Sequence, residues 1–359
     1  MKTLKDFNVE NKRVLVRCDF NVPLDEKGNI LDDFRIKQAL PTIEYLIKNG
    51  AKVILMSHLD PESTGVADKK YTLDKVAEKL AEYLGFSIEK EDDCIGPYVE
   101  NESNKLEPGK VLLLENLRFQ KEETEGSLDF AKKLAEMGDI YVNDAFSVCH
   151  RNHASIAGVP KFLDNCAGLL LQKEIETLDK ILHGAEKPMI AIVGGTKVET
   201  KSKFIDKISE VADFVIISGL IAKEVLDLPA QAGKNIKFKF PEKIITPMGQ
   251  LDALDINEET IKMFCEKTML AKTVLWNGPF GKFEEEKYAK GTLAIARAII
   301  RSKAFSVVGG GETVEFIQKY GLIDRFSHVS TGGGAMMAYL SGEELPGLKA
   351  LGGPTSFKV

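Results

Sequence analysis

The sequence predicts an α/β protein built from two doubly wound, Rossmann-like parallel-sheet domains that are joined by a hinge helix. Its 359 residues exceed the roughly 250–300 that a single hydrophobic core usually serves. Short apolar runs alternate with amphipathic segments along the chain, which is typical of parallel strands covered by helices on both faces. The alternation restarts after an amphipathic segment near the middle, so the second half predicts a second domain.

The first half of the chain predicts buried strands with helices between them. One helix is expected at about 35–48, where Ile36 and Ile43 lie on the same apolar face. Another helix is expected at about 73–84, with Val76 and Leu80 on its apolar face. The strands of this half are expected at 13–18, 52–56, 110–114 and 140–142.

The second half repeats this pattern after a bridging helix expected over 165–182. Leu171, Ile175 and Leu178 give that helix one apolar face. Strands are then expected at 189–193, 214–217, 273–276, 305–308 and 328–330, and helices near 201–211, 258–267, 292–301 and 313–320. The domain boundaries that follow are 1–163 for the first domain, 164–182 for the hinge helix and 183–330 for the second domain.

Composition excludes several classes of protein. The net charge is −6 with acids and bases mixed along the chain, which argues against a dedicated nucleic-acid surface. The five cysteines are scattered and odd in number, which disfavours a disulfide framework and favours a reducing compartment. Since the sequence shows neither a signal core nor an uncharged run of about 18–20 residues, we expect a cytoplasmic protein without a membrane partner.

Polar side chains follow the predicted strands of the first half. Ligands of open α/β sheets bind outside the carboxyl ends of the strands, and Asp19, Asn21 and His58 come directly after such ends. Arg35, Arg118 and Arg151 lie near strand ends or in the loops after them, and the planar arginine fork matches carboxylate and phosphate oxygens. A lone arginine is more often a solvated surface residue, but three beside these polar groups indicate an anionic ligand.

Glycine follows the predicted strands of the second half. Gly309–Gly311 stands between a strand and the helix expected at 313–320, where backbone N–H groups can approach a phosphate closely. A tight turn explains one such run equally well, but Gly194-Gly195 and Asn277-Gly278 repeat the arrangement. Neither a dinucleotide-binding nor a P-loop fingerprint is present, which disfavours a dehydrogenase and a Walker-type ATPase. Together the two halves predict phosphoryl transfer between an anionic metabolite and a nucleotide.

Eight ordered motifs then resemble those of the phosphoglycerate kinase family. They are Val-Arg-Cys-Asp-Phe-Asn-Val-Pro at 16–23, Asp-Asp-Phe-Arg-Ile at 32–36, Glu-Asn-Leu-Arg-Phe at 115–119, Asn-Asp-Ala-Phe at 143–146 with His-Arg-Asn-His-Ala-Ser at 150–155, Gly-Gly-Thr-Lys-Val at 194–198, Trp-Asn-Gly-Pro at 276–279, Gly-Gly-Gly-Glu-Thr at 309–313, and Val-Ser-Thr-Gly-Gly-Gly-Ala at 329–335. The resemblance runs from about residue 5 to about residue 351.

The resemblance implies reversible transfer of the acyl phosphate of 1,3-bisphosphoglycerate to ADP, with Mg²⁺ as cofactor and a monomer as the usual state. It implies that Arg35 and Lys201 are catalytic, because they would stabilise the charge of the transferred group. It also implies that the segment 331–359 returns toward the hinge and the first domain. By the same resemblance, the phosphoglycerate ligands are Asp19, Asn21, Arg35, His58, Arg118 and Arg151. The nucleotide ligands are Lys197, Lys201, Asn277, Glu284, Gly310, Gly311, Glu312 and Thr313, and Glu312 is also the metal ligand.

The sequence departs from the family pattern at several positions. The segment 57–61 reads Ser-His-Leu-Asp-Pro and lacks an arginine that usually follows, for which Lys69 or Lys70 are candidate replacements. The adenine-pocket segment reads Ser-Gly-Leu-Ile at 218–221, and the region between it and Trp276 is shorter than usual. Glu312 stands where aspartate is common. An alternative function therefore stays open: a catalytically weakened or altered-substrate relative that binds nucleotide or an anionic metabolite.

Overall fold

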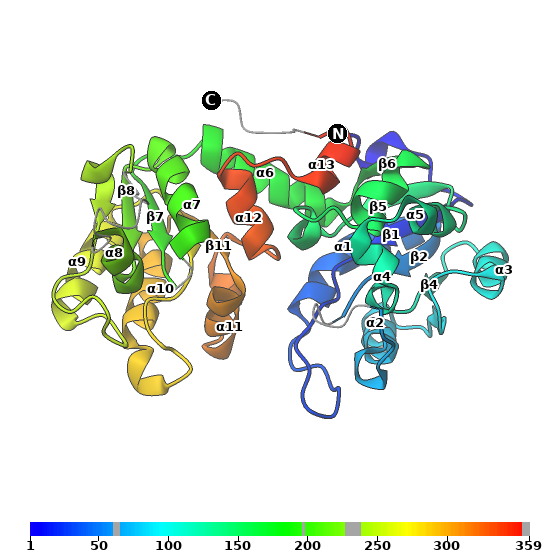
Figure 1. Cartoon of the computed structure of the whole chain (residues 1–359), viewed down its shortest axis with the longest axis horizontal. Helices are drawn as coiled ribbons and strands as arrows, with labels where there is room; N and C mark the ends of the chain where they lie inside the picture. Colours follow the sequence, from blue (N-terminus) through cyan, green and yellow to red (C-terminus); the bar gives the residue numbers. More distant parts are fainter. Residues whose placement is uncertain (60–64, 196–197, 227–237, 354–359) are drawn as a thin grey trace. The chain divides into compact units, whose positions relative to one another are not determined.

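The computed structural model describes residues 1–59, 65–195, 198–226 and 238–353, and these form two compact units (Figure 1). Unit 1 contains Met1–Ile175 together with the described segment from Glu344 onward, and unit 2 contains Glu176–Glu343. Within the described residues, each unit has one six-stranded sheet in which every pairing is parallel. The predicted fold class is confirmed.

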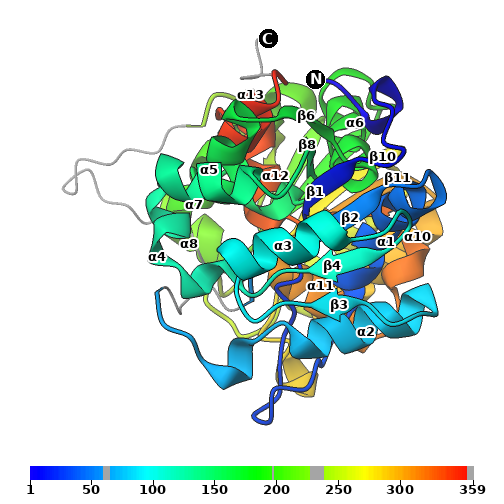
Figure 2. The ribbon, with the colours of Figure 1, turned by 90° about the vertical axis from the view of Figure 1, so that its right-hand side faces the viewer.

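Unit 1 arranges its strands in the order β3-β4-β2-β1-β5-β6, and Figure 2 shows part of this series from β1 to β3. Its strands are β1 (Arg13–Arg17), β2 (Lys52–Met56), β3 (Glu89–Lys90), β4 (Val111–Leu113), β5 (Ile140–Asn143) and β6 (Asp164–Ala167). Its helices are α1 (Phe34–Lys48), α2 (Asp74–Leu84), α3 (Pro97–Lys105), α4 (Lys121–Glu125), α5 (Leu128–Ala135) and α13 (Pro346–Ala350). Helix α6 (Leu169–His183) begins in unit 1 and ends in unit 2.

Unit 2 arranges its strands in the order β12-β11-β10-β7-β8-β9. The strands are β7 (Met189–Val193), β8 (Phe214–Ile217), β9 (Ile244–Ile245), β10 (Thr273–Asn277), β11 (Phe305–Gly309) and β12 (His328–Val329). The helices are α7 (Val198–Val211), α8 (Gly219–Leu226), α9 (Glu258–Met269), α10 (Lys290–Ser302), α11 (Gly311–Lys319) and α12 (Gly333–Leu340).

The central strands are apolar because helices cover the sheets on both faces. All five residues of β7 and all five of β10 are buried, which explains why β7 is a continuous apolar run and why Val274–Trp276 are apolar in succession rather than alternating. Trp276 of β10 is fully buried, and its indole N–H donates to the carbonyl of Gly278 over 2.9 Å. This bond satisfies the one polar atom of a side chain that otherwise contributes apolar contact.

The helix expected over 165–182 begins later than predicted, at Leu169. The residues before it, Asp164–Ala167, form strand β6 and pair with β5. The sequence did not indicate this strand because it is short, polar at its start and at the edge of the sheet. The two-residue strands β3 and β9 also escaped prediction, since neither is a buried apolar run: Glu89 of β3 is exposed and both residues of β9 are only half-buried.

The C-terminal segment returns to unit 1 from Glu344 onward, whereas residues 331–343 of the segment that the resemblance implies belong to unit 2. The backbone N–H of Gly347, in α13, donates to the carbonyl of Cys149 over 2.9 Å. A side chain at position 347 would come within 2.9 Å of Ile156, so only glycine permits this approach. Within the described residues, no helix has the length and apolarity needed to cross a membrane.

Unit 1 holds the first turn of α6 with two buried side chains. The hydroxyl of Thr42 accepts a hydrogen bond from the N–H of Leu169 over 2.9 Å. The carboxyl Oδ1 of Asp144 accepts from the N–H groups of Leu170 and Leu171, at 2.9 and 3.3 Å. The first N–H groups of a helix have no partner within it, so these bonds fix the helix start to unit 1.

Burial raises the pKa of Asp144 from 3.8 to about 7, against the opposing effect of these hydrogen bonds. Its second oxygen, Oδ2, is buried without a hydrogen-bond partner among the described residues, which agrees with a carboxyl that is hard to ionise. A folded-state pKa above that of the unfolded chain contributes stability at low pH. This contribution is lost as the pH rises from about 4 through about 7.

We therefore expect Asp144→Asn to change how stability depends on pH. Asparagine keeps an acceptor oxygen for α6 but cannot ionise, so the variant should gain stability relative to wild type as the pH rises from 5 to 8. Urea unfolding at these two pH values measures the difference. Asp144→Ala, the control, lacks the acceptor and should be less stable than Asp144→Asn by roughly 1–2 kcal/mol at both pH values. Equal pH dependence of wild type and Asp144→Asn would contradict the expectation.

Candidate active site

The predicted acid-binding residues of unit 1 meet where β1 ends. The carboxyl of Asp19 accepts from Arg35 Nη1 over 2.7 Å, and the same Nη1 donates to the carbonyl of Asn21 over 3.1 Å. His58 follows β2, with its Nδ1 3.9 Å from the Asp19 carboxyl. The topology explains this meeting, because β1 pairs with both β2 and β5, and the strand order changes direction beside β1.

Asp19 is an ionised carboxylate despite being buried. Burial alone would raise its pKa, but the Arg35 guanidinium and a hydrogen bond from the Ser147 hydroxyl lower the pKa to about 2. Ser147 comes from the segment after β5, more than a hundred residues away in sequence. Asp19 thus fixes Arg35 while part of the arginine side chain, 31% exposed, remains open to solvent.

The remaining predicted cations, Arg118 and Arg151, lie after β4 and β5. Arg118 is buried in a short 3₁₀ turn, and burial together with Arg17 lowers its pKa. Arg151 is exposed. Burial lowers the pKa of His153 to about 3, and the charges of Arg118, Arg17 and Arg151 act in the same direction. The positive potential of these arginines would attract an anion to this end of the sheet.

Arg17 is a member of this cluster that sequence reasoning missed. It ends β1, its side chain is fully buried, and its Nη2 lies 3.2 Å from His58 Nδ1. Its position in the apolar run 13–18 hid it as part of a buried strand. An arginine inside a buried strand is itself a signal, because a fully buried charge is rare unless it has a partner.

In unit 2 the backbones after β7 and β10 touch each other. Gly194 donates to the carbonyl of Asn277 over 2.8 Å, and Gly195 donates to that of Pro279 over 2.8 Å. A side chain on Gly194 would overlap the carbonyl oxygens of Gly278 and Pro279. The two glycine-containing turns therefore form one rigid strand-end structure, again at the point where the strand order changes direction.

The predicted nucleotide residues gather around these turns. Lys201 Nζ donates to the carbonyl of Gly194. A Cβ on Gly195 would lie 2.5 Å from Lys201 Nζ and 3.6 Å from a carboxyl oxygen of Glu312, so both side chains converge there. The Thr313 hydroxyl accepts from Gly278 N–H over 2.7 Å. Lys197 lies outside the described residues.

The loop before α11 carries the other predicted ligands. Gly310 has a φ of +101°, which favours glycine, and a Cβ there would lie 3.1 Å from Asn277 Nδ2. That Nδ2 is buried without a hydrogen-bond partner among the described residues, so it can still donate to a ligand. Gly311 begins α11, and apart from its chain neighbours and the backbone of α11 itself, no atom of the described residues lies within 4 Å of the position that a Cβ would take.

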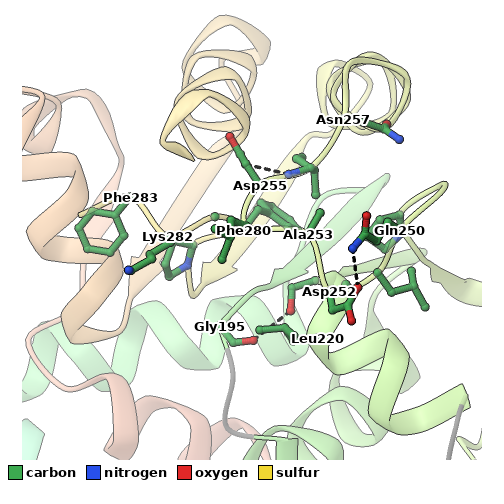
Figure 3. A pocket seen from close by; sticks show the side chains of 18 of the residues that line it. Gly195, Leu220, Gln250, Asp252, Ala253, Asp255, Asn257, Phe280, Lys282 and Phe283 are labelled. Atoms are coloured by element: carbon green, nitrogen blue, oxygen red, sulfur yellow. Dashed lines mark hydrogen bonds between the residues drawn. The ribbon is translucent and has the colours of Figure 1, made fainter. Parts of the chain in front are cut away.

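A pocket of about 490 Å³ lies beside these turns in unit 2. Figure 3 shows Gly195 and Leu220 on its lower wall, with Phe280 and Ala253 above them. Glu284 and Glu312 also line it. One cavity thus joins apolar walls suited to a flat base with the glycine turns suited to phosphates.

The segment 218–221, which departs from the family pattern, contributes to the wall of this pocket. The Ser218 hydroxyl donates to the carbonyl of Gly195 over 3.0 Å, so it contributes to the turn rather than to a ligand. Asp252 closes one edge, where it accepts from Lys223 over 2.6 Å and from Gln250 over 3.1 Å. Sequence reasoning missed this apolar wall because its residues come from loops without periodicity.

A cationic strand-end site on one parallel sheet and a glycine-lined pocket on another are typical of a two-domain α/β phosphotransferase. The family model described as phosphoglycerate kinase matches residues 4–243 and 231–343. The chain belongs to the phosphoglycerate kinase family.

Individual relatives agree along nearly the whole chain. The phosphoglycerate kinase of Moorella thermoacetica is 43% identical over 389 residues, covering 97% of this chain and 98% of the relative. That of Borrelia hermsii is 41% identical, covering 98% and 99%. Solved structures of phosphoglycerate kinases from Pyrococcus horikoshii and Coxiella burnetii superpose with TM-scores of 0.85 and 0.80, each at 34% identity and 98% coverage of both chains.

The comparisons also support the predicted shortening. The alignment with the Moorella relative spans 389 residues, more than the 359 of this chain, so it contains segments that this chain lacks. The two parts matched by the family model meet at 231–243, which lies between Ser218 and Trp276.

Two glycine substitutions separate the structural role of the turns from their ligand role. Gly194→Ala should destabilise unit 2 by several kcal/mol, because its Cβ meets carbonyl oxygens that cannot move independently. Gly311→Ala should leave the melting temperature within about 2 °C of wild type, because its Cβ has room. Its methyl group would instead occupy space at the start of α11 and weaken ATP binding. Thermal unfolding and nucleotide titration measure both effects, and a stable Gly194→Ala protein would refute the rigid contact.

Proposed function

We propose that this protein is a phosphoglycerate kinase that transfers the acyl phosphate of 1,3-bisphosphoglycerate to ADP, reversibly, to give 3-phosphoglycerate and ATP. Beyond family membership, one observation carries the acid half of this reaction. Among the described residues, the hydrogen bonds of Arg35 are made by Nη1 alone, so its Nε and Nη2 groups remain for an anion. The fixed, partly exposed guanidinium supports binding of a carboxylate or phosphate.

The nucleotide half is supported by the pocket of unit 2. Asn277 Nδ2 and the backbone N–H groups at the start of α11 are donors of the kind that phosphate oxygens require. Lys197, Lys201 and Thr313 are proposed as further phosphate ligands, and Glu284 as the ligand of the ribose. The ligands of the acid are proposed to be Asp19, Asn21, Arg35, His58, Arg118 and Arg151.

The mechanism depends on charge stabilisation rather than on proton transfer. Phosphoryl transfer passes through a loose transition state with charge on the equatorial oxygens of the transferred group. Arg35 and Lys201 would stabilise that charge, and each is oriented by hydrogen bonds to backbone carbonyl oxygens. The attacking oxygen of ADP is already anionic, so no general base is needed. The two ligands are assigned to different units, and hinge closure that brings them together stays a prediction.

A magnesium ion is proposed to arrive with the nucleotide. Glu312 supplies a carboxylate at the start of α11, close to Gly195. Within the described residues, no group of three or more histidine, cysteine, aspartate or glutamate side chains is arranged to hold a metal. The single carboxylate of Glu312 suits Mg²⁺, which is commonly held by one or two carboxylates together with substrate phosphates. When bound, the ion would neutralise phosphate charge.

The remaining proposals concern the cellular location, the type of partner and the oligomeric state. All five cysteines are free thiols, which supports a reducing compartment and a cytoplasmic location. The mixed charge of the chain supports small-molecule substrates rather than nucleic acid. A monomer is proposed from the habit of the family.

A coupled assay tests the proposed function directly. Purified protein with 3-phosphoglycerate, MgATP, glyceraldehyde-3-phosphate dehydrogenase and NADH should oxidise NADH, and omission of either substrate should abolish the signal. EDTA in excess should remove the activity, because the nucleotide would lose its metal. Tight MgATP binding without turnover would instead favour a relative with another acidic substrate.

Arg35→Ala should lower kcat by on the order of a hundredfold, since one charged donor to the transition state is lost. The KM for ATP should change by less than about threefold, because the substitution lies in unit 1 and the nucleotide is assigned to unit 2. Arg325→Ala, which removes an exposed arginine from unit 2, serves as the control. Undiminished turnover of Arg35→Ala would rule out the proposed role.

A further inference from the structure

A buried chain of hydrogen bonds lies behind the acid-binding site of unit 1 and begins at Glu123. This residue belongs to α4, and its side chain is fully buried. One carboxyl oxygen, Oε1, accepts from the Ser155 hydroxyl over 2.5 Å, and the other, Oε2, accepts from the Ser155 N–H over 2.8 Å. Both oxygens of Glu123 are thus committed to Ser155, which orients the serine hydroxyl.

The chain of hydrogen bonds continues from Ser155 to Arg17. Because the serine hydroxyl donates its proton to Glu123, its oxygen is free to accept, and Arg17 Nε donates to it over 2.8 Å. Arg17 Nη1 donates to the carbonyl of Cys18. The Tyr141 hydroxyl, from β5, donates to the carbonyl of Ser155 over 2.8 Å and holds the serine in place. The Arg17 guanidinium is therefore fixed in one orientation.

The chain ends at His58, where it selects a tautomer. Arg17 Nη2 lies 3.2 Å from His58 Nδ1. A guanidinium can only donate hydrogen bonds, so Nδ1 has to be the unprotonated acceptor. The competing partner of Nδ1 is the Asp19 carboxyl, but at 3.9 Å it is too distant for a hydrogen bond. The ring proton of neutral His58 must then sit on Nε2.

We propose that Glu123 is a positioning residue which, through Ser155 and Arg17, fixes His58 as a neutral Nε2–H donor to the acidic substrate. The opposite tautomer would present an acceptor lone pair to an anion, which is repulsive. The substrate half of this inference rests on the proposed function, whereas the tautomer is a property of the protein alone. A measurement of the tautomer and a measurement of substrate binding therefore test the two halves of the inference separately.

Charges around the ring also keep His58 neutral. Burial lowers its pKa well below 6.5, and Arg17, Arg118 and Arg35 act in the same direction, while Asp19 opposes them. The alternative role for Glu123 is simple charge balance, because its carboxyl is also 3.9 Å from Arg17 Nη2. Charge balance would support folding but would not require a particular His58 tautomer.

The first experiment is long-range ¹H–¹⁵N NMR of histidine-labelled full-length protein without substrate. The protein has five histidines, and the spectrum of the His58→Gln variant identifies the signal of His58 by its absence. We expect the wild-type ring to show a protonated Nε2 and an unprotonated Nδ1 from pH 6 to 8. A protonated Nδ1 in wild type would overturn the inference.

The second experiment compares Glu123→Gln with wild type. Glutamine replaces one of the two carboxyl oxygens with an NH2 donor, so it cannot accept from the Ser155 hydroxyl and the Ser155 N–H through separate oxygens as Glu123 does. We expect the His58 signals to change to a mixture of tautomers. The KM for 3-phosphoglycerate should rise roughly tenfold, with the KM for ATP changed by less than about twofold. A lowered melting temperature with an unchanged His58 tautomer would show that Glu123 only balances the charge of Arg17, and it would overturn the proposal.

Two further variants keep the test decisive. Glu122→Gln alters the neighbouring, partly exposed residue of the same helix and should change neither the His58 signals nor either KM. Ser155→Ala removes the hydroxyl that links Glu123 to Arg17, but it keeps the Glu123 carboxylate that balances the charge of Arg17. It therefore replaces Glu123→Gln if that variant does not fold. Inactive wild-type protein with the expected His58 tautomer would refute the proposed function and leave the positioning chain intact.

Discussion

Parallel pairing between strands that are far apart in sequence is the constraint on which both sites depend. In unit 1, β1 pairs with β5 so that Arg17 lies level with Asn143. In unit 2, β7 pairs with β10 so that Val193 lies level with Asn277. Each register brings two strand ends to one edge, and the residues just beyond those ends have to meet. Asp19 therefore reaches Ser147, and Gly194 reaches Gly278.

The sequence could predict the parts of the site that lie directly after strands. Asp19, Asn21 and His58 were identified because a polar residue after an apolar run is a local signal, and the structure brings them together. Ser147 and Glu123 could not be identified this way, since Ser147 acts on a residue more than a hundred positions away and Glu123 reaches Arg17 only through Ser155. The fold class followed from the repeated alternation of strands and helices. Edge strands such as β6 did not, because a short polar strand depends on its neighbour rather than on its own composition.

The two units offer opposite means for the anion binding that we propose. Unit 1 uses side-chain charge, with Arg35 held by an ionised Asp19 and with Arg17 and Arg118 buried behind it. Unit 2 uses backbone N–H groups and close glycine contacts, with Lys201 as its described cation at the turns. Arginine forks suit a small acid whose oxygens have fixed geometry. Backbone donors suit a chain of phosphates, because successive N–H groups can follow it.

The contact between Gly194 and Gly278 has a consequence for the electrostatics of unit 2. It immobilises the Gly194 carbonyl, and that carbonyl is the acceptor for Lys201. The ammonium group is thus pre-organised: folding has already removed it from bulk water and oriented it before any nucleotide arrives. A charge placed in advance needs little reorganisation at the moment of reaction, which is how a fixed dipole or cation lowers an activation barrier more than a mobile one does.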